Sequence, residues 1–311
     1  MVPPSSSTPP VAHRASAEWT EADAPILTRT LGRAWAVPGN LVRHRALWLA
    51  GARRELSARL SGTVLGKLWP VLQPLALFAV YYTLFARVFG MGFPSQADGS
   101  DAATGVYLFL GVVTWSAFAE SLTRGTLAFT ERGELLKRAA FPAEVLPLQT
   151  IIAQQILMLV GLAAFVAVSS LAGIWPLPGA AVICVPLIFV LQALFTLGLC
   201  LVFATLHALL RDTQHFVGVL ATLWMFATPI FWIPSAAVLP GVEPFLPWLQ
   251  WNPMHAFVSC WRQALMSQAP SEAFSAGLLE SMLHATVWAA VSLCSGSFLF
   301  ACGARRLPDE V

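Results

Sequence analysis

Few side chains in this sequence are spaced for catalysis or for nucleotide binding. The segment from Gly62 to Lys67 invites comparison with a phosphate-binding loop, but its two glycines are separated by three residues instead of four. Leu68 also stands where a Ser or Thr would hold magnesium. We therefore expect no cofactor in this chain: if ATP drives the protein, another polypeptide binds ATP and Mg²⁺.

The other candidates for chemistry are acidic, histidine and cysteine side chains. Asp98 and Asp101 have a DxxD spacing, but no His or Lys accompanies them, and a membrane enzyme such as a glycosyltransferase needs clustered acids, bases or metal ligands. The sequence does not favour that alternative. The five cysteines share no CxxC spacing, so no metal site is expected. The scattered histidines are His207, His215, His255 and His284.

The elements that must position any functional side chain are set by the composition. Of 311 residues, 57% are hydrophobic and only 11% are charged, whereas a typical soluble domain has about 25% charged residues. The apolar residues form runs of roughly 20, the length that a helix needs to cross a bilayer core. A soluble enzyme, a nucleic-acid-binding protein and a disordered protein are excluded. The composition predicts an all-α polytopic membrane protein.

Six segments are predicted as membrane-spanning helices. The second of them contains Glu120 and Arg124, which stand four apart in the favourable order on one helix face. Charges inside a span serve either as a structural pair or in a conduit or gate, and both interpretations stay open. The predicted spans are residues 68–86, 105–127, 148–172, 180–206, 214–233 and 278–301.

Basic residues predict the orientation of these spans. Nine Lys and Arg residues precede the first span, three lie between the second and third, one lies between the fourth and fifth, and two follow the sixth. The segments 90–104 and 173–179 contain none. By the positive-inside rule, both termini are predicted to be cytoplasmic. The transmembrane domain then covers residues 67–303, and residues 304–311 form a cytoplasmic tail.

The residues before the first span divide into two predicted parts. Residues 1–39 are expected to be a disordered cytoplasmic tail. Residues 40–66 are basic and amphipathic, with Arg43 and Arg54 opposite an apolar side. We expect this segment to lie along the inner membrane surface as an interface helix, with a cytosolic surface helix as the alternative. The apolar side carries Leu41, Trp48, Leu49, Ala52, Leu56 and Leu60.

The connection between the fifth and sixth spans begins with a predicted re-entrant segment, residues 234–262, which is apolar where a soluble loop would be polar. Prolines break it repeatedly, yet it keeps large aromatic residues. This pattern predicts short helices that dip into the outer leaflet as a re-entrant gate beside a conduit. The residues predicted for this gate are Pro240, Pro244, Phe245, Pro247, Trp248 and Trp251.

Two further groups have alternative interpretations. The 130–138 loop is charged and is predicted to form a short helix; it is either a solvated loop or a docking surface for a cytoplasmic subunit. Aromatic residues of the first two spans either pack, or form a conduit wall in which ring faces meet sugar C–H groups weakly and repeatedly. The conduit candidates are Tyr81, Tyr82, Phe85, Phe89, Trp115 and Phe118.

Several of these motifs together resemble one family, the ABC-2 type permeases that export polysaccharides. The resemblance covers about residues 40–303. It lies in Arg54-Glu55-Leu56, Leu65-Gly66-Lys67-Leu68-Trp69-Pro70, the run from Tyr81 to Phe89, Leu108-Phe109-Leu110-Gly111 with Trp115, the run from Leu135 to Pro142, Arg211-Asp212, Thr228-Pro229-Ile230-Phe231, Asn252-Pro253 and Trp261-Arg262.

The resemblance implies half of a transporter in the bacterial cytoplasmic (inner) membrane. Two copies would pair with two ATP-hydrolysing subunits and move a lipid-linked polysaccharide, such as O-antigen, outward. A related exporter of a drug, haem or a lipo-oligosaccharide is the alternative. Membrane lipids are further expected partners. No nucleic acid is expected to bind. The residues expected to contact the ATPase are Glu131, Glu134, Leu135, Lys137, Arg138 and Phe141.

Overall fold

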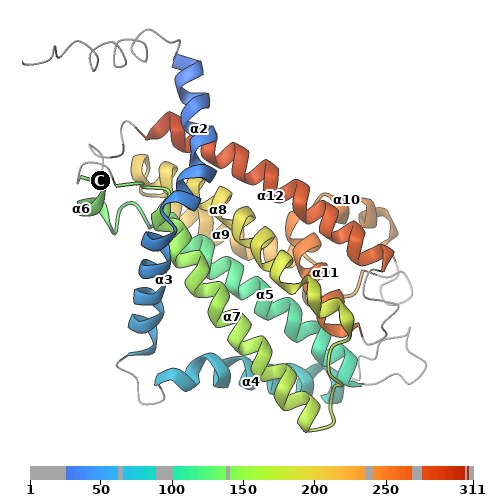
Figure 1. Ribbon diagram of the computed structural model, residues 1–311. Helices are drawn as coiled ribbons and strands as arrows, with labels where there is room; N and C mark the ends of the chain where they lie inside the picture. Colours follow the sequence, from blue (N-terminus) through green and yellow to red (C-terminus); the bar gives the residue numbers. More distant parts are fainter. Residues whose placement is uncertain are drawn as a thin grey trace, which may run out of the picture.

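The computed structural model describes residues 26–61, 66–88, 101–137, 141–234, 241–267, 275–304 and 307. Within these ranges every regular element is a helix (Figure 1). The α-helices are α2 (Ile26–Arg43), α3 (Arg45–Leu60), α4 (Trp69–Tyr81), α5 (Asp101–Thr126), α6 (Gly133–Leu136), α7 (Val145–Leu171), α8 (Val185–Leu209), α9 (Thr213–Ala227), α10 (Leu246–Gln250), α11 (Pro253–Met266) and α12 (Ala276–Gly303). The 3₁₀-helices are η1 (Gly66–Leu68), η3 (Ala180–Cys184) and η4 (Glu243–Phe245), and η2 (Tyr82–Val88) is a π-helix.

Four helices in the described ranges are long and apolar enough to cross a membrane: Ala102–Thr126, Val145–Leu171, Ala180–Leu209 and Ala276–Gly303. At 1.5 Å per residue each exceeds a bilayer core of about 30 Å. In Figure 1 they run diagonally beside one another, with α6 near one end and α10 near the other. We call these the α6 end and the α10 end. The most buried of the four is α5, which contacts α4, α7, α8 and α11.

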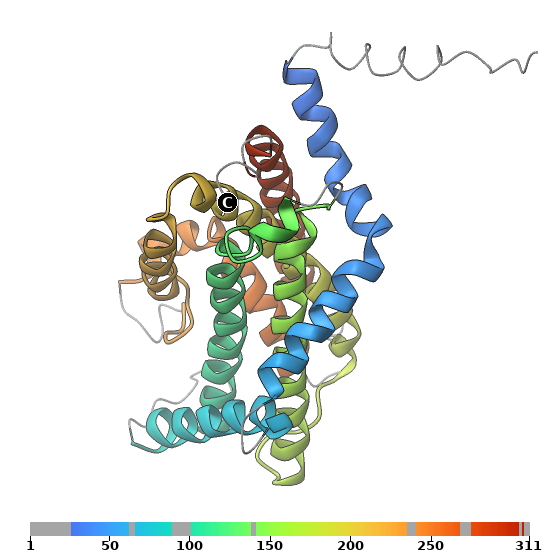
Figure 2. The same ribbon diagram turned by 90° about the vertical axis from the view of Figure 1, so that its left-hand side faces the viewer.

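The first predicted span, residues 68–86, is not one regular α-helix. α4 ends at Tyr81, and the chain continues as the π-helix η2. Figures 1 and 2 both show α4 inclined steeply to the long helices, and it packs against α5 and α7. Gly161 of α7 provides the room for the ring of Pro74 within α4.

The fifth predicted span, residues 214–233, is also shorter in the structure. α9 has 15 residues and ends at Ala227, where Thr228 adopts an extended ψ of 138°. Thr228 precedes Pro229, and a residue before proline is disfavoured in the α region. The described residues thus contain four helices with the length and composition of a span, and six crossings stay a prediction.

The structure corrects part of the predicted disordered tail. Residues 26–39 are helical and belong to α2, which packs against α12. Val37 and Leu41 stand one turn apart and are buried, and this apolar stripe was hidden by the Ser- and Pro-rich residues that precede it. Residues 1–25 lie outside the described residues. In the predicted C-terminal tail, Leu307 is buried against the core.

The predicted interface helix 40–66 is divided in the structure. His44 interrupts the helix between α2 and α3, and α3 ends at Leu60. α3 packs along α7, and Gly51 lies so close to the Gln149 side chain that a Cβ would overlap it. The buried side of α3 also includes Glu55, which the apolar side of the predicted wheel does not contain.

Candidate functional site

The 130–138 loop lies at the α6 end and carries the single-turn helix α6 (Figure 1). The side chains of Glu131, Glu134 and Lys137 are exposed, while Leu135 and Phe141 are half-buried and pack against the core. Residues 130–135 and Lys137 line a concavity of about 460 Å³. The loop therefore presents charges of both signs on a small protrusion. Of the predicted docking residues, Arg138 lies outside the described residues.

A buried polar network fixes this loop to the rest of the chain. Arg132, the residue before α6, donates to Glu55 Oε2 at 2.9 Å and to Gln149 Oε1 at 3.0 Å. Thr150 also donates to Glu55 Oε2, at 3.1 Å, and Arg59 donates to Glu55 Oε1 at 3.0 Å. We call these five residues the Glu55 network. It joins α3, the 130–138 loop and the start of α7 at one carboxylate.

Electrostatics keep this carboxylate ionised. Burial by itself would raise the pKa of Glu55, but the hydrogen bonds and positive charges of Arg59 and Arg132 outweigh it, so the pKa lies below its ordinary value. This role was hard to predict from the sequence: Glu55 occurs in the motif Arg54-Glu55-Leu56, but its partners Arg132 and Thr150 are 77 and 95 positions away.

The lowered pKa sets the pH dependence of this network. A carboxyl whose pKa is lower in the folded state contributes stability above the unfolded-state pKa, and loses it as pH falls through the folded-state pKa. We expect Glu55→Gln to lower the apparent Tm by a constant amount from about pH 8 to about pH 6, and the difference from wild type to shrink only below about pH 4.3. Thermal unfolding in detergent measures this. A difference that vanishes near neutral pH would contradict it.

A second buried cation lies toward the α10 end. Arg262 of α11 donates from Nε to the Tyr107 carbonyl at 3.1 Å, from Nη1 to the Pro229 carbonyl at 2.7 Å and from Nη2 to the Ile230 carbonyl at 3.2 Å. Its guanidinium carbon is also 3.3 Å from the centroid of the Tyr107 ring. No carboxylate among the described residues pairs with it. We call this the Arg262 clamp.

The Arg262 clamp explains why several sequence motifs occur together. After α9 ends, the carbonyls of Pro229 and Ile230 have no helical partner, and buried carbonyls need a donor. Arg262 supplies it from α11 and at the same time holds α5 at Tyr107. Gly111, one turn further along α5, leaves the space that the guanidinium fills. The structure thus brings three separate motifs into one contact.

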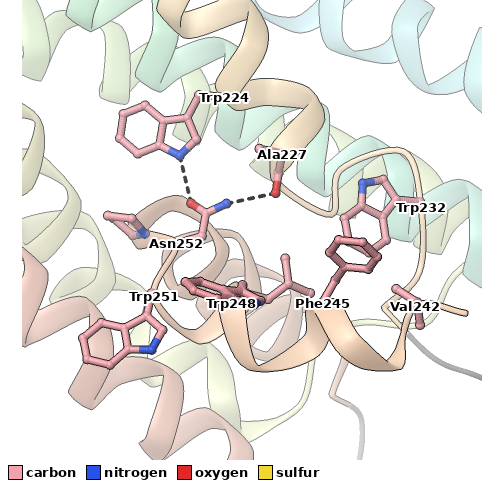
Figure 3. A pocket seen from close by; sticks show the side chains of 10 residues that line it. Trp224, Ala227, Trp232, Val242, Phe245, Trp248, Trp251 and Asn252 are labelled. Carbon is pink, nitrogen blue, oxygen red and sulfur yellow. Dashed lines mark hydrogen bonds between the residues drawn. The ribbon is translucent and has the colours of Figure 1, made fainter.

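Beside this clamp the structure forms a cavity of about 700 Å³, which we call the tryptophan cavity (Figure 3). Asn252 accepts from Trp224 Nε1 at 2.8 Å and donates to the Ala227 carbonyl at 3.1 Å, so it joins the end of α9 to the start of α11. It also caps α11 by accepting from the Met254 amide. The lining residues are Trp224, Ala227, Trp232, Val242, Phe245, Trp248, Leu249, Trp251, Asn252 and Pro253.

Several predicted gate residues line this cavity. Phe245, Trp248 and Trp251 are 63%, 73% and 73% exposed. Phe245 lies on η4, Trp248 lies on α10, and Trp251 directly follows α10. Pro244 and Pro247 stand at the starts of these two elements, where proline is tolerated. Pro240 lies outside the described residues. Short helices are therefore present in this segment, and their insertion into the outer leaflet stays a prediction.

The predicted conduit aromatics are placed differently. Trp115 and Phe118 are 4% and 1% exposed and pack against Trp224 and Phe195 inside the chain. The packing alternative therefore describes both. Tyr82 is half-buried, with its ring 5.8 Å from that of Phe78. The side chains of Tyr81 and Phe85, and all of Phe89, lie outside the described part of the structure.

The charged pair inside the second predicted span is on the accessible side of α5. Arg124 hydrogen-bonds Glu120, and their side chains are 52% and 41% exposed. Glu120 also borders a crevice of about 380 Å³ between α3, α4, α5 and α7. Gln73 and Ser116 line the same crevice, so part of this surface of the helical body is polar.

These features define a helical membrane protein with a charged loop at one end and an aromatic cavity at the other. The chain belongs to the ABC-2 type transporter family, whose model matches residues 46–266. It is 29% identical over 253 residues to the O-antigen export system permease protein RfbA of Myxococcus xanthus, covering 81% of this chain and 93% of that protein. Two proteins of the same name from Klebsiella pneumoniae are 28% and 27% identical, over 69% of this chain and 78% of each relative. The resemblance read from the motifs is thus confirmed.

Proposed function

We propose that this chain is the transmembrane subunit of an ATP-driven exporter that moves a lipid-linked polysaccharide outward across the bacterial cytoplasmic membrane. The observation that carries the proposal is the similarity, over most of the chain, to three permeases named for O-antigen export. ATP and Mg²⁺ would bind to a separate nucleotide-binding subunit, since this family of membrane domains acts with an ATPase.

The α6 end would face the cytoplasm, with both termini on that side. In support, the basic residues concentrate before the first span and in the 130–138 loop, as the positive-inside rule requires. α4 with η2, and α9 with the turn after it, would complete six crossings, each passing the bilayer as a broken or inclined element. Two copies would assemble, because the helices of one copy, several of them almost purely apolar, are too few to enclose a conduit as wide as a polymer.

The tryptophan cavity would contact sugar residues as they leave. Flat indole faces meet the C–H faces of pyranoses without a demand for one hydrogen-bond pattern, and a conduit needs contacts that are weak and repeated. In support, Trp232, Phe245 and Trp248 surround the cavity, as Figure 3 shows, and Asn252 holds their supporting elements together. This position replaces Trp115 and Phe118 as the candidate aromatic surface for the polymer.

One experiment tests the proposal as a whole. The chain is deleted in its native host and the surface polymer is examined; separately, the tagged chain is purified together with the products of its neighbouring genes. We expect the deletion to abolish the surface polymer and the purification to recover an ATPase. A deletion strain with an intact surface polymer would refute polysaccharide export and leave a drug, haem or lipo-oligosaccharide as the cargo.

The docking role of the 130–138 loop makes a separate prediction. Glu134→Arg with Lys137→Glu reverses two exposed charges, so we expect the fold to persist while ATPase recovery falls by about tenfold, since charge complementarity selects partners. These positions are better probes than Leu135 and Phe141, which pack against the core. Glu280→Arg, an exposed site at the start of α12, is the control. Unchanged ATPase recovery in the double variant would exclude this loop as the docking surface.

A further inference from the structure

We propose that Glu55 is a positioning residue that joins α3, the 130–138 loop and the start of α7 into one body, so that motion of the loop is passed on to α3. The inference rests on the proposed function, because it assigns a path for motion imposed on the loop by an ATPase. It concerns a residue that lines neither the concavity of the loop nor the tryptophan cavity. The contacts of its two carboxylate oxygens carry the argument.

Both carboxylate oxygens are engaged, and by different elements. Oε2 accepts from Arg132 of the loop and from Thr150 of α7, while Oε1 accepts from Arg59, one turn later on α3. Arg132 itself stands directly before α6, so the docking helix begins one residue after the ion pair. A displacement of α6 therefore reaches Glu55 of α3 and Gln149 of α7 through the same side chain, Arg132.

The packing around Glu55 leaves little freedom to absorb such a displacement. Its side chain is 13% exposed and that of Arg132 is 27% exposed. One turn earlier, Gly51 is in direct contact with Gln149, which is also an acceptor for Arg132. An ion pair that is largely buried contributes less net stability than apolar packing would, but its geometry is specific. The arrangement is thus better suited to fixing a position than to adding stability.

Glu55 also connects, through Arg59, to the crevice beside α4 and α5. Arg59, held by Glu55, also hydrogen-bonds Gln154 of α7. Arg59 and Leu60 form one wall of the crevice that Trp69 and Glu120 line from α4 and α5. A shift of α3 therefore changes the crevice between the first two predicted spans. The 130–138 loop would act on this crevice through the Glu55 network.

The test uses the complex of the full chain with its ATPase in liposomes that contain the lipid-linked polymer. The variants are Glu55→Gln, Arg132→Gln and the two combined. ATPase recovery, ATP hydrolysis and the amount of polymer moved per ATP are measured. Asn40→Ala is the matched control, because Asn40 makes a similar contact at the α6 end, a 2.8 Å hydrogen bond from α2 to Glu144, without touching the loop helix or Glu55.

We expect Glu55→Gln to keep ATPase recovery and ATP hydrolysis near wild type, while polymer moved per ATP falls by about tenfold. The loss in the double variant should be smaller than the two single losses combined, because Glu55→Gln and Arg132→Gln break the same ion pair. Asn40→Ala should keep the wild-type ratio. If Glu55→Gln does not fold, Arg132→Gln tests the same ion pair by removing its partner in the loop.

Two results would overturn this inference and leave the proposed function intact. In the first, Glu55→Gln moves as much polymer per ATP as wild type. In the second, it loses ATPase recovery in parallel with export, which would mean that Glu55 only maintains the docking surface. Failure of the proposed function is distinct, because it shows in the wild-type arm: a wild-type complex that moves no polymer refutes that function and this inference with it.

Discussion

Replacement of Arg262 by methionine is expected to lower the yield of the folded chain several-fold. Methionine fills a similar volume but removes every donor, so the Ile230 carbonyl loses the Arg262 hydrogen bond and the Pro229 carbonyl keeps only that from the Tyr107 hydroxyl, at 3.4 Å. The Tyr107 carbonyl, inside α5, loses its additional bond from Nε. A buried acceptor left without a donor costs about 1–3 kcal/mol, and loss of the guanidinium contact with the Tyr107 ring adds to this cost, against a net stability of about 5–15 kcal/mol for a typical protein. The yield of monodisperse protein after detergent extraction, and its apparent Tm, measure the effect.

Two variants separate the Arg262 clamp from a general effect of charge. Arg262→Lys keeps the positive charge but has no planar fork, so it should be intermediate. Arg43→Met removes an exposed arginine and should leave the apparent Tm within about 1 °C of wild type. If Arg262→Met and Arg43→Met proved equally stable, the clamp would not hold α11 to α5.

Gly111→Ala should be destabilising for the same reason as Arg262→Met, since its Cβ would displace the guanidinium.

The long apolar helices could be predicted closely from the sequence. The predicted spans 105–127, 148–172, 180–206 and 278–301 each lie within three residues, at every end, of the helices observed. Hydropathy alone locates such helices. Each backbone group forms its hydrogen bond within the helix, so the length and the polarity of the segment decide whether it can cross a membrane.

For the two remaining spans, hydropathy did not predict the breaks that the structure shows. Hydropathy does not distinguish an α-helix from the π-helix that continues α4 over Tyr82–Val88. It also ignores the stop that Pro229 imposes on α9. Both features depend on backbone geometry and not on polarity, so a window of apolar residues predicts one straight span where the chain has a break.

The candidate site was less predictable because its key contacts join distant residues. A helical wheel of α3 shows Glu55 as a polar position but does not show that α7 and the 130–138 loop supply a Thr and an Arg to meet it. Trp115 and Phe118 illustrate the opposite difficulty. In a membrane helix the lipid-facing, conduit-facing and buried sides are all apolar, so sequence alone could not decide among them.

The contact between α8 and α12 makes the second large prediction. Gly198 of α8 faces Gly296 of α12, and a Cβ on either glycine would overlap the backbone of the other helix. Ser292 strengthens this contact by donating to the Phe195 carbonyl at 2.8 Å. Small residues at such a crossing let two membrane helices approach closely enough for extensive packing. We therefore expect Gly296→Leu to separate the two helices and to destabilise the chain by about 3 kcal/mol or more.

Gly218→Leu is the matched control for this prediction, because Gly218 of α9 has open space where its Cβ would be placed. The two variants add the same side chain to a helical glycine, so helix propensity favours leucine at both positions. Only the space around the new side chain differs between them. An apparent Tm for Gly296→Leu that matches Gly218→Leu would show that α8 and α12 do not touch through these glycines. A loss confined to Gly296→Leu, and to Gly198→Leu on the facing helix, would show that close packing of α8 against α12 at this crossing holds the chain together. The same crossing would then be the fixed part of the chain, against which α3 and the loop move.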